Sequence, residues 1–328
     1  MMKRENDLRA SGSVPSVSVI VPTYDRPQML KEALKSILNQ SYQDFEIIVV
    51  NDGGQEIGEV LTALNRPDKI RNFRHKWNRG MAAARNTGLK AARGKYIAYL
   101  DDDDIFYRGH LETLITFLGS TRYLVAYTDA YRARKEIVHG KSVVTRRVLP
   151  YSFDFDCDRI LVSNQVPMLC VMHETTCLNR VGYFDETLRM LEDWDLLIRL
   201  SRNFRIAHLK KVTCEFRSGE YGSSVSTSRQ GEFLRTVMRI HARNRTFSAL
   251  PNIDKWLVNP VAAKVARELA CYHLYSKRWG RGRAAMKMWK EQAGVRLRGT
   301  RLLHSPIEQE TLKKNKTDFH EQSAVQSV

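Results

Sequence analysis

The sequence predicts an α/β protein built on a doubly wound, mostly parallel sheet, followed by a basic segment of helical character. Short apolar stretches alternate with stretches of helical periodicity between Val17 and Leu100, and this alternation is typical of such sheets. Polar and acidic residues directly follow several of the apolar stretches. Because ligands bind at the carboxyl ends of the strands in sheets of this type, these polar residues are the first candidates for a functional site.

The elements of the first hundred residues follow from their local patterns. Val17 to Pro22 and Phe45 to Val50 are short runs rich in β-branched residues, and the second ends at the turn-forming sequence Asn51-Asp52-Gly53-Gly54. Between these runs, apolar residues recur at helical spacing. The sequence predicts strands at 17–22, 45–50, 70–74 and 96–100, and helices at 27–39, up to about 64 and at 81–92.

The pattern is less regular after residue 105. Residues 123–127, 141–148 and 168–171 have β-like composition, and 193–200 has the pattern of an amphipathic helix. After residue 223 the sequence shows long helical patterns rich in Arg and Lys. We therefore expect a polar lead at 1–15, a main α/β domain at 16–222, and a basic helical region at 223–328 whose end is loosely ordered.

Composition and charge narrow the class of protein. The net charge is +17, and residues 229–328 carry 20 Lys and Arg against 8 Asp and Glu. The five cysteines form no C-x-x-C pair, which is typical of reduced thiols in the cytosol and makes a structural zinc site improbable. The N-terminus does not resemble a signal peptide, and no stretch approaches the roughly 18 to 20 apolar residues of a membrane span. We expect a cytoplasmic protein, either soluble or peripheral at the inner face of the cytoplasmic membrane.

Four consecutive aspartates, Asp101 to Asp104, follow the apolar run at 96–100. Their carboxylates repel one another, so a purely surface role would be wasteful at the end of a strand. Mg²⁺ and Mn²⁺ prefer oxygen ligands and are usually held by one or two carboxylates together with substrate phosphates. The alternatives are a solvated acidic turn or a calcium loop, although an EF-hand loop needs a Gly and a distant Glu that are wrongly placed here. Position and composition favour a site for a metal and a diphosphate.

Several motifs in a fixed order resemble glycosyltransferase family 2. They are Val17-Ser18-Val19-Ile20-Val21-Pro22-Thr23-Tyr24-Asp25-Arg26, Ile48-Val49-Val50-Asn51-Asp52-Gly53, Gly80-Met81-Ala82-Ala83-Ala84-Arg85-Asn86-Thr87-Gly88-Leu89, Tyr99-Leu100-Asp101-Asp102-Asp103-Asp104, Gly182-Tyr183-Phe184-Asp185-Glu186 and Leu191-Glu192-Asp193-Trp194-Asp195-Leu196. Each motif alone is weak, but their order over roughly residues 15–217 is specific. The resemblance implies the GT-A fold, with a donor half at 16–104 and an acceptor half at 105–222. It also implies a mostly inverting, metal-dependent activity on nucleotide-sugars.

The resemblance implies roles for residues at the strand ends. Thr23 and Asp25 would line the nucleoside pocket, Asp52 would accept a hydrogen bond from the base, usually the uracil imide, and Arg85 would approach the nucleotide. Each has a simpler alternative, since Thr23 can satisfy a turn and Asp52 before two glycines is a good turn former. Arg85 lies at a helix start, where phosphate is favoured electrostatically.

The aspartate run would carry the D-x-D motif of the family. By that resemblance Asp103 and Asp101 would hold Mn²⁺ or Mg²⁺, with Asp103 the more direct ligand and Asp101 also contacting the donor. Because the run is fourfold, its register is open and Asp102 is also a donor-site candidate.

The second acidic cluster, Glu192-Asp193-Trp194, matches the position of the catalytic base in the family. Sugar transfer needs a base to accept the proton of the acceptor hydroxyl, and the resemblance assigns this role to Asp193. Glu192 would orient an acceptor hydroxyl and Trp194 would offer a face on which a sugar stacks. The alternative is a helix N-terminus that favours acids through its dipole, with Trp194 in the core.

One departure concerns the metal site. Family members often carry a histidine after an aromatic-Arg pair near the end of the catalytic domain, but residues 216–221 contain none. This puts a third protein ligand in doubt, although Glu220 could substitute. A lone histidine is more often structural than functional, so we do not assign His173 to the site.

The basic region at 278–290 interleaves Arg and Lys with Trp and Met. This pattern suits either a helix on an anionic membrane or a helix packed on the main domain with its charged face in water. Nucleic-acid binding is not expected, because no recognised module accompanies the charge.

The leading hypothesis is an inverting hexosyl- or N-acetylhexosaminyl-transferase that uses a UDP-sugar. Its acceptor would be a glycan or a lipid-linked molecule in polysaccharide, lipopolysaccharide or capsule-type synthesis. The alternatives are a nucleotidyltransferase, which usually has a Gly-rich basic loop after the first strand, and a non-enzymatic basic adaptor for membranes or nucleic acid.

Overall fold

The computed structural model describes residues 14–138, 141–162, 164 and 166–218, together with the single positions 236, 239, 240 and 243. Within these residues the strands form one nine-stranded mixed sheet in the order β3-β2-β1-β4-β8-β6-β9-β5, and β7 pairs with β6. The predictions for the lead at 1–13 and for the basic region lie outside the described residues, apart from the four single positions. Among the described residues, no helix is both long and apolar enough to span a bilayer.

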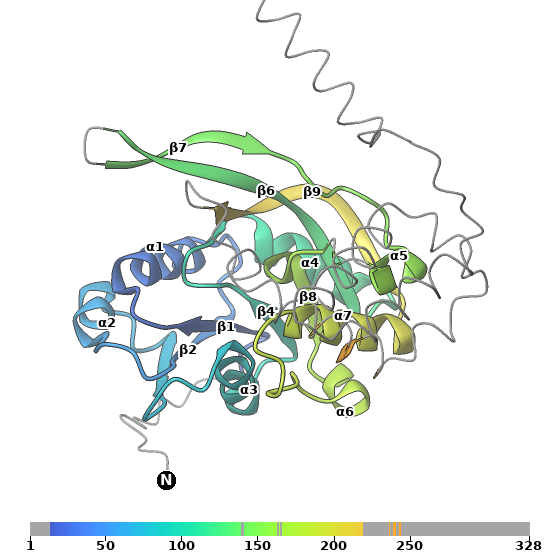
Figure 1. The fold of residues 1–328 in the computed structure, drawn as a ribbon, viewed down its shortest axis with the longest axis horizontal. Coiled ribbons are helices and arrows are strands. Elements are labelled where there is room, and N and C mark those ends of the chain that lie inside the picture. Colours follow the sequence, from blue (N-terminus) through green and yellow to red (C-terminus); the bar gives the residue numbers. More distant parts are fainter. Residues whose placement is uncertain are drawn as a thin grey trace, which may run out of the picture. The chain divides into compact units, whose positions relative to one another are not determined.

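Residues 17–99 alternate strands and helices, as the sequence predicts. Its strands are β1 (Val17–Thr23), β2 (Phe45–Asn51), β3 (Ile70–Arg74) and β4 (Tyr96–Tyr99), and its helices are α1 (Pro27–Leu38), α2 (Gly58–Leu64) and α3 (Met81–Ala91). All neighbouring pairs among these strands are parallel. Figure 1 shows α1 and α3 on opposite sides of β1 and β2, which is the doubly wound arrangement.

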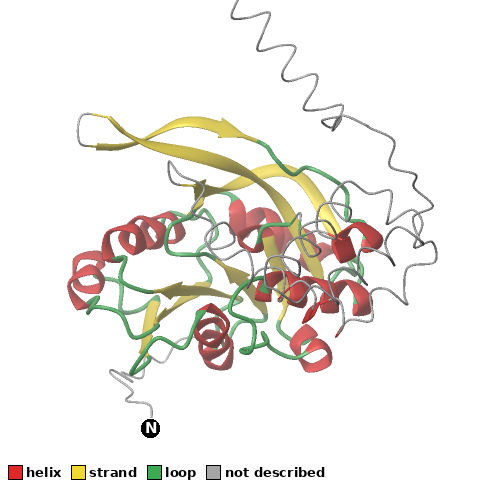
Figure 2. Ribbon diagram, viewed as in Figure 1, coloured by secondary structure: helices red, strands yellow, loops and turns green. Residues whose placement is uncertain are grey.

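The hydrophobic core explains why these strands are central. Every residue of β1, β2 and β4 is buried, as expected for parallel strands covered on both faces. The helices contribute an apolar stripe, with Leu30, Leu34 and Ile37 of α1 fully buried. Figure 2 shows helices on both sides of this part of the sheet. The carboxyl ends of β1, β2 and β4 therefore meet at one edge of a rigid layer.

The part of the domain from residue 105 to residue 218 is more irregular. Its elements are β5 (Ile105–Phe106), α4 (His110–Ser120), β6 (Val125–Val138), β7 (Lys141–Val148), α5 (Cys157–Val162), the 3₁₀ turn η1 (Met168–Cys170), β8 (Val171–Glu174), α6 (Cys177–Val181), α7 (Glu192–Asn203) and β9 (Ile206–Ser218). β8 is antiparallel to both β4 and β6, whereas β6 and β9 are parallel. The α/β prediction is confirmed, and the sheet is parallel from β3 to β4 but mixed beyond β4.

Two sequence expectations for this part were incomplete. The segment at 168–171 was expected to be a strand, but it is a 3₁₀ turn that leads into β8, and the strand itself lies at Val171–Glu174. β9 was not predicted, because polar side chains interrupt the alternation of apolar and polar residues that identifies a strand. Its register with β6 also shifts near Asp129. β6, β7 and β9 run side by side as a long ribbon (Figure 1).

Candidate active site

Two of the four aspartates after β4 are buried and anchor the run. Asp102 accepts a hydrogen bond of 2.7 Å from the Thr23 hydroxyl at the end of β1. Asp104 accepts a hydrogen bond of 3.0 Å from the backbone N–H of Arg217 in β9, and its own N–H donates to the Asp101 carbonyl at 3.1 Å. Burial raises the pKa of Asp102 to about 6 and raises the pKa of Asp104 well above its usual value. These two carboxylates therefore fix the turn rather than face solvent.

The other two, Asp101 and Asp103, have side chains that are 33% and 36% exposed. Asp103 accepts a hydrogen bond of 2.9 Å from Arg26, which lies just before α1. Burial, followed by the charge of Asp101, raises the pKa of Asp103. An added cation would offset this repulsion between the two carboxylates.

The donor set fits Mg²⁺ or Mn²⁺ only in part. Two accessible carboxylates match the usual arrangement in which phosphates and water supply the remaining ligands. Within the described part of the chain, no three His, Cys, Asp or Glu side chains gather as a metal centre. Glu220, the other candidate ligand, lies outside that part. The residues present therefore suit a cation that arrives with a diphosphate.

Arg85 joins the aspartate run to the second acidic cluster. It lies on α3, is only 3% exposed, and donates from Nη2 to Asp101 at 2.7 Å and from Nη1 to Glu192 at 2.6 Å. Its Nε has no hydrogen-bond partner among the described residues, and the ring of Phe184 lies 5.5 Å from its Cζ. The sequence did not predict this bridge, and the expected approach of Arg85 to a nucleotide stays a prediction.

Glu192 and Asp193 lie at the N-terminus of α7. The residue before them, Leu191, has a φ of 61°, a left-handed conformation that is uncommon for a non-glycine residue. Burial raises the pKa of Glu192 to about 7, although the charge of Arg85 opposes this shift. Burial likewise raises the pKa of Asp193, which accepts hydrogen bonds from Asn164 Nδ2 at 3.1 Å and from the next backbone N–H at 2.8 Å. A carboxylate with a raised pKa is a stronger base.

Trp194 does not have the exposure that a sugar-stacking role requires. Its side chain is 4% exposed, and its indole N–H donates to the carbonyl of Ile160 at 2.5 Å. The ring packs in the core, and a contact between Trp194 and an acceptor stays a prediction without structural support. The structure agrees with the alternative interpretation, in which Trp194 belongs to the hydrophobic core.

Asp52 organises the loop between β3 and α3. Its Oδ1 accepts from the ring of His75 at 2.6 Å and from the N–H of Arg79 at 2.9 Å, while Oδ2 accepts from the N–H of Gly80 at 2.8 Å. His75 in turn contacts the Thr87 hydroxyl at 2.8 Å. Oδ2 keeps one lone pair for a further donor. Asp52, at the end of β2, thus holds the loop between β3 and α3 in place before any ligand binds.

Asp25 lies beside this loop with a φ of 55°. Its Oδ1 accepts a hydrogen bond of 2.7 Å from the N–H of Gln55. Gly53 has a φ of 81°, and a Cβ there would lie 2.4 Å from the carbonyl carbon of Trp77. The hydrogen bond between Asp25 and Gln55 brings the turns after β1 and β2 together. The close approach at Gly53 brings the turn after β2 against the loop that carries Trp77.

The predicted residues therefore form one connected edge. Thr23 is hydrogen-bonded to Asp102, which follows Asp101 in the chain. Arg85 is hydrogen-bonded to both Asp101 and Glu192, and Asp193 follows Glu192 directly. The sequence analysis missed Arg26, His75 and Asn164. Arg26 stands within a quoted motif and could have been noticed, whereas a single His or Asn in a loop gives no signal.

Comparisons with known proteins identify the family of this chain. The family model described as "Glycosyl transferase family 2" matches residues 18–178. An uncharacterized glycosyltransferase of Bacillus subtilis, YwdF, is 33% identical over 60% of this chain and 71% of its own length. An uncharacterized glycosyltransferase of Rickettsia conorii is 33% identical over 61% of this chain but only 32% of its own length. The chain thus spans about a third of the Rickettsia relative.

Solved structures share the fold at lower identity. S. aureus TarS 1-349 superposes with a TM-score of 0.55 at 22% identity, covering 81% of this chain and 74% of TarS. A mannosyltransferase of Pyrobaculum calidifontis, solved with GDP-Man and Mn²⁺, gives a TM-score of 0.50 at 18% identity, with 87% and 89% coverage. These likenesses establish the GT-A fold. The family model and the match over most of YwdF show that the chain belongs to glycosyltransferase family 2.

Proposed function

We propose that this protein is an inverting, metal-dependent glycosyltransferase that moves a sugar from a UDP-sugar to an acceptor hydroxyl. The observation that carries the proposal is the buried Arg85 bridge, which brings the aspartate run within one side chain of the Glu192-Asp193 pair. An inverting transfer needs a donor site and one base on the face opposite the leaving group. The bridge sets these two acidic groups next to each other.

The donor side would be formed by the ends of β1, β2 and β4. The free lone pair on Asp52 Oδ2 would accept the imide N–H of uracil, with Thr23 and Asp25 shaping the pocket around the nucleoside. Asp103 and Asp101 would hold Mn²⁺ or Mg²⁺, and Arg26 would offer a guanidinium to the phosphates. When bound, the cation supplies Lewis-acid stabilisation to the departing diphosphate. Support for UDP and for Mn²⁺ comes from TarS solved with UDP and UDP-GlcNAc and from the mannosyltransferase solved with Mn²⁺.

The acceptor side would use Asp193. As the acceptor oxygen bonds to the anomeric carbon, the bond from that carbon to the diphosphate oxygen breaks, and Asp193 accepts the hydroxyl proton. Asn164 holds Asp193 in place, and Glu192 would orient the acceptor hydroxyl. Burial favours protonation of Asp193, which suits a group that must accept a proton.

The biological setting follows from the same proposal. We infer a hexosyl- or N-acetylhexosaminyl-transferase acting on a glycan or lipid-linked acceptor in polysaccharide or lipopolysaccharide assembly. Its place of action would be the cytoplasm, with peripheral contact at the inner face of the membrane. Membership of a glycosyltransferase family disfavours both the nucleotidyltransferase and the adaptor alternatives.

The test measures binding and transfer separately. Calorimetry with UDP, GDP and CDP, with and without Mn²⁺, should show UDP binding that requires the metal. Asp193→Asn should retain this binding but lose transfer from a panel of UDP-sugars by at least about a hundredfold, the lower range of a general base. Asp103→Asn should lose binding, and Asp68→Asn, in an exposed pair with Arg66, is the matched control. Transfer by Asp193→Asn at the wild-type rate would refute the base assignment, and no nucleotide binding with any metal would refute the proposal.

A further inference from the structure

The basic region contacts the main domain at its four described positions. Thr236, Arg239, Ile240 and Arg243 are helical, and their spacing of three, four and seven residues from the first puts them on one face of a helix. Thr236 and Ile240 are 7% and 1% exposed, and Ile240 belongs to the hydrophobic core. Figure 1 shows this short orange stretch beside α7. None of the roles proposed above uses this contact.

The two arginines of this face hold one turn of the main domain, residues 185–188. Arg243 donates to the carboxylate of Asp185, and Arg239 donates to the carbonyl of Thr187 at 3.2 Å. Within the turn, Asp185 accepts from the N–H and the hydroxyl of Thr187 at 2.9 and 2.7 Å. Two side chains from the basic region therefore meet the same few residues.

The charge of Arg243 is matched by the carboxylate that it meets. Burial would raise the pKa of Asp185, but the hydrogen bonds from Thr187 and the charge of Arg243 outweigh burial and lower it below its usual value. Arg243 also lies 3.8 Å from Asp195 in α7, which Arg199 already engages. The side chains of Asp185 and Arg243 are 17% and 47% exposed. Their ion pair therefore adds little to global stability, but it fixes the geometry of the turn.

The residue beside Asp185 connects this turn to the candidate active site. Glu186 accepts hydrogen bonds from Asn86 on α3 at 3.0 Å and from the guanidinium of Arg79 at 3.1 Å. The backbone N–H of Arg79 donates to Asp52 at 2.9 Å, and Asp52 is the carboxylate proposed to accept the uracil imide. The turn thus reaches the loop between β3 and α3 through a single side chain.

The link between Glu186 and Arg79 depends on support from the turn. The two side chains are 38% and 41% exposed, and an ion pair this exposed contributes little by itself, because ordering two long side chains costs conformational entropy. Asn86 binds one carboxylate oxygen of Glu186, and the turn fixes the backbone that carries it. A turn held by two arginines therefore keeps Glu186 within reach of Arg79.

We propose that Arg243 and Arg239 are positioning residues for donor binding. They hold the turn so that Glu186 keeps Arg79 in place, and Arg79 in turn presents its N–H to Asp52. The inference rests on the proposed function, because it concerns nucleotide binding at the same site. It gives this part of the basic region a role in the main domain that is separate from any contact with a membrane.

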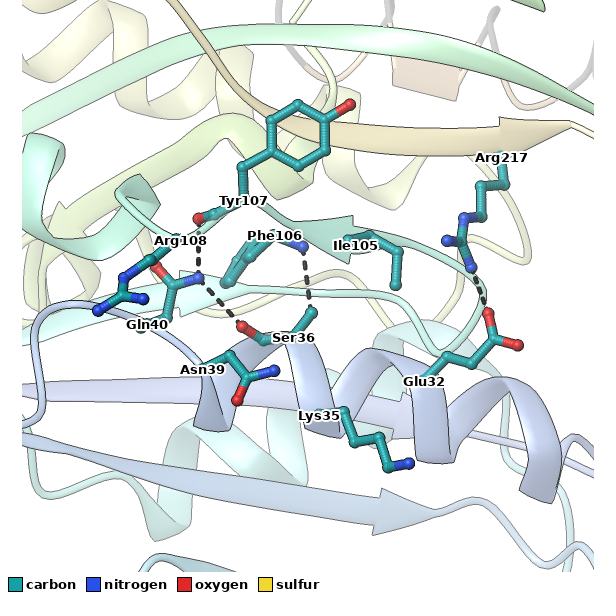
Figure 3. A pocket seen from close by; sticks show the side chains of 10 residues that line it. All are labelled: Glu32, Lys35, Ser36, Asn39, Gln40, Ile105, Phe106, Tyr107, Arg108 and Arg217. Carbon is teal, nitrogen blue, oxygen red and sulfur yellow. Dashed lines mark hydrogen bonds and ion pairs between the residues drawn. The ribbon is translucent and has the colours of Figure 1, made fainter. Parts of the chain in front are cut away.

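Amide hydrogen exchange of the full-length protein without nucleotide measures the coupling directly. In Arg243→Gln, the N–H groups of Arg79 and Gly80 that donate to Asp52 should exchange about three- to fivefold faster, as expected for the loss of one partly exposed ion pair. Arg243→Lys keeps the charge and should restore most of the protection. The matched control is Arg108→Gln, because this exposed arginine forms no ion pair within the described residues (Figure 3). Unchanged exchange in Arg243→Gln, or an equal rise in the control, overturns the inference.

Calorimetry then tests whether the supported loop matters for the donor. Arg243→Gln should weaken the binding of UDP with Mn²⁺ about three- to fivefold, while transfer at saturating donor stays near the wild-type rate. Glu186→Gln should weaken binding similarly, and the double variant should bind no more weakly than the weaker single variant, because both side chains act through one link. Fully additive losses in the double variant would contradict this coupling. A lower free energy of unfolding in urea, with unchanged exchange and UDP affinity, would show that Arg243 has a structural role alone.

UDP binding by the wild-type protein separates failure of this inference from failure of the proposed function. If UDP binds with Mn²⁺ while Arg243→Gln changes neither exchange nor affinity, the inference is wrong and the function stands. If exchange at Arg79 and Gly80 rises in the variant while the wild-type protein binds no nucleotide, the support of the loop stands and the donor assignment fails.

Discussion

Replacing Arg85 by glutamine should destabilise the protein strongly, although the substitution is small. Arg85 is 3% exposed and pairs with two carboxylates at 2.6 and 2.7 Å. Removing one partner of a buried ion pair leaves uncompensated charge and costs about 3–5 kcal/mol. The Glu192 side chain is 8% exposed, but that of Asp101 is 33% exposed and is screened by water. We therefore expect the free energy of unfolding to fall by about 3 kcal/mol, the lower end of that range.

The loss should depend on pH in a defined direction. The pKa of Glu192 is raised to about 7 by burial, so the folded state binds this proton more tightly than the unfolded state. Its contribution to stability is therefore present at low pH and is lost as the pH rises toward 7. Arg85 opposes the shift, so Arg85→Gln moves the pKa of Glu192 further up. The variant should be less destabilised at pH 5.5 than at pH 8.

Urea unfolding at the two pH values, in EDTA, measures both effects. Arg85→Gln/Glu192→Gln removes the unpaired carboxylate and should recover part of the lost stability while transfer stays impaired. Arg26→Gln is the control, because Arg26 is 51% exposed in its pair with Asp103 and should contribute less than about 1 kcal/mol. A loss below about 1 kcal/mol in Arg85→Gln, or no recovery in the double variant, would refute the idea that this bridge is a buried electrostatic link.

Further predictions concern the core, the nucleotide loop and the metal. Burial lowers the pKa of His173 to about 4, so the unfolded state binds more protons and stability should fall by about 3 kcal/mol as the pH drops from 6.5 to 4. His173→Gln should flatten this dependence in urea unfolding, and an unchanged slope would contradict it. Tyr99→Phe removes the 2.7 Å hydrogen bond to His173 and should cost about 1 kcal/mol by the same measurement; no loss would mean that water replaces the bond. Gly53→Ala places a Cβ 2.4 Å from the carbonyl carbon of Trp77, at a backbone φ of 81°. Calorimetry should therefore show that the affinity for UDP falls about tenfold or more. An affinity equal to that of the wild type would show that this loop does not shape the nucleotide pocket. Dialysis against EDTA should abolish transfer and Mn²⁺ should restore it; activity that survives chelation would refute metal dependence.

The donor half could be predicted because its local signals agree with one another. β1, β2 and β4 are apolar runs that are buried on both faces, and each leads into polar residues at the sheet edge. A parallel sheet brings those ends together by topology alone. Proximity of Thr23 to the aspartate run therefore follows from strand order without any long-range information.

β9 could not be predicted in the same way. His208 in this strand has a side chain that is 2% exposed, lies between Asp129 and Asp154, and stacks on Tyr127. A buried histidine with carboxylate partners breaks the apolar-polar alternation that identifies a strand. The partners come from other segments, so the pattern is intelligible only once the fold is known.

The links within the site had no sequence signal either. Arg85 and Glu192 are 107 residues apart, and nothing local indicates that they form a pair. The sequence identified both as candidates but gave them separate roles. For Trp194 the sequence left two interpretations open, and the burial of its ring agrees with the one that places it in the core.

The aspartate run has an evolutionary consequence. Like charges within a single turn repel each other in the folded protein, and the raised pKa values of Asp102, Asp103 and Asp104 reflect this repulsion together with burial. Selection for stability alone would replace some of these carboxylates by neutral residues. Their presence in one turn implies that the chain tolerates a weaker fold in exchange for a charged edge. Designs that stabilise this protein should therefore draw on substitutions elsewhere, because neutral substitutions in the run would remove the carboxylates proposed to hold the metal.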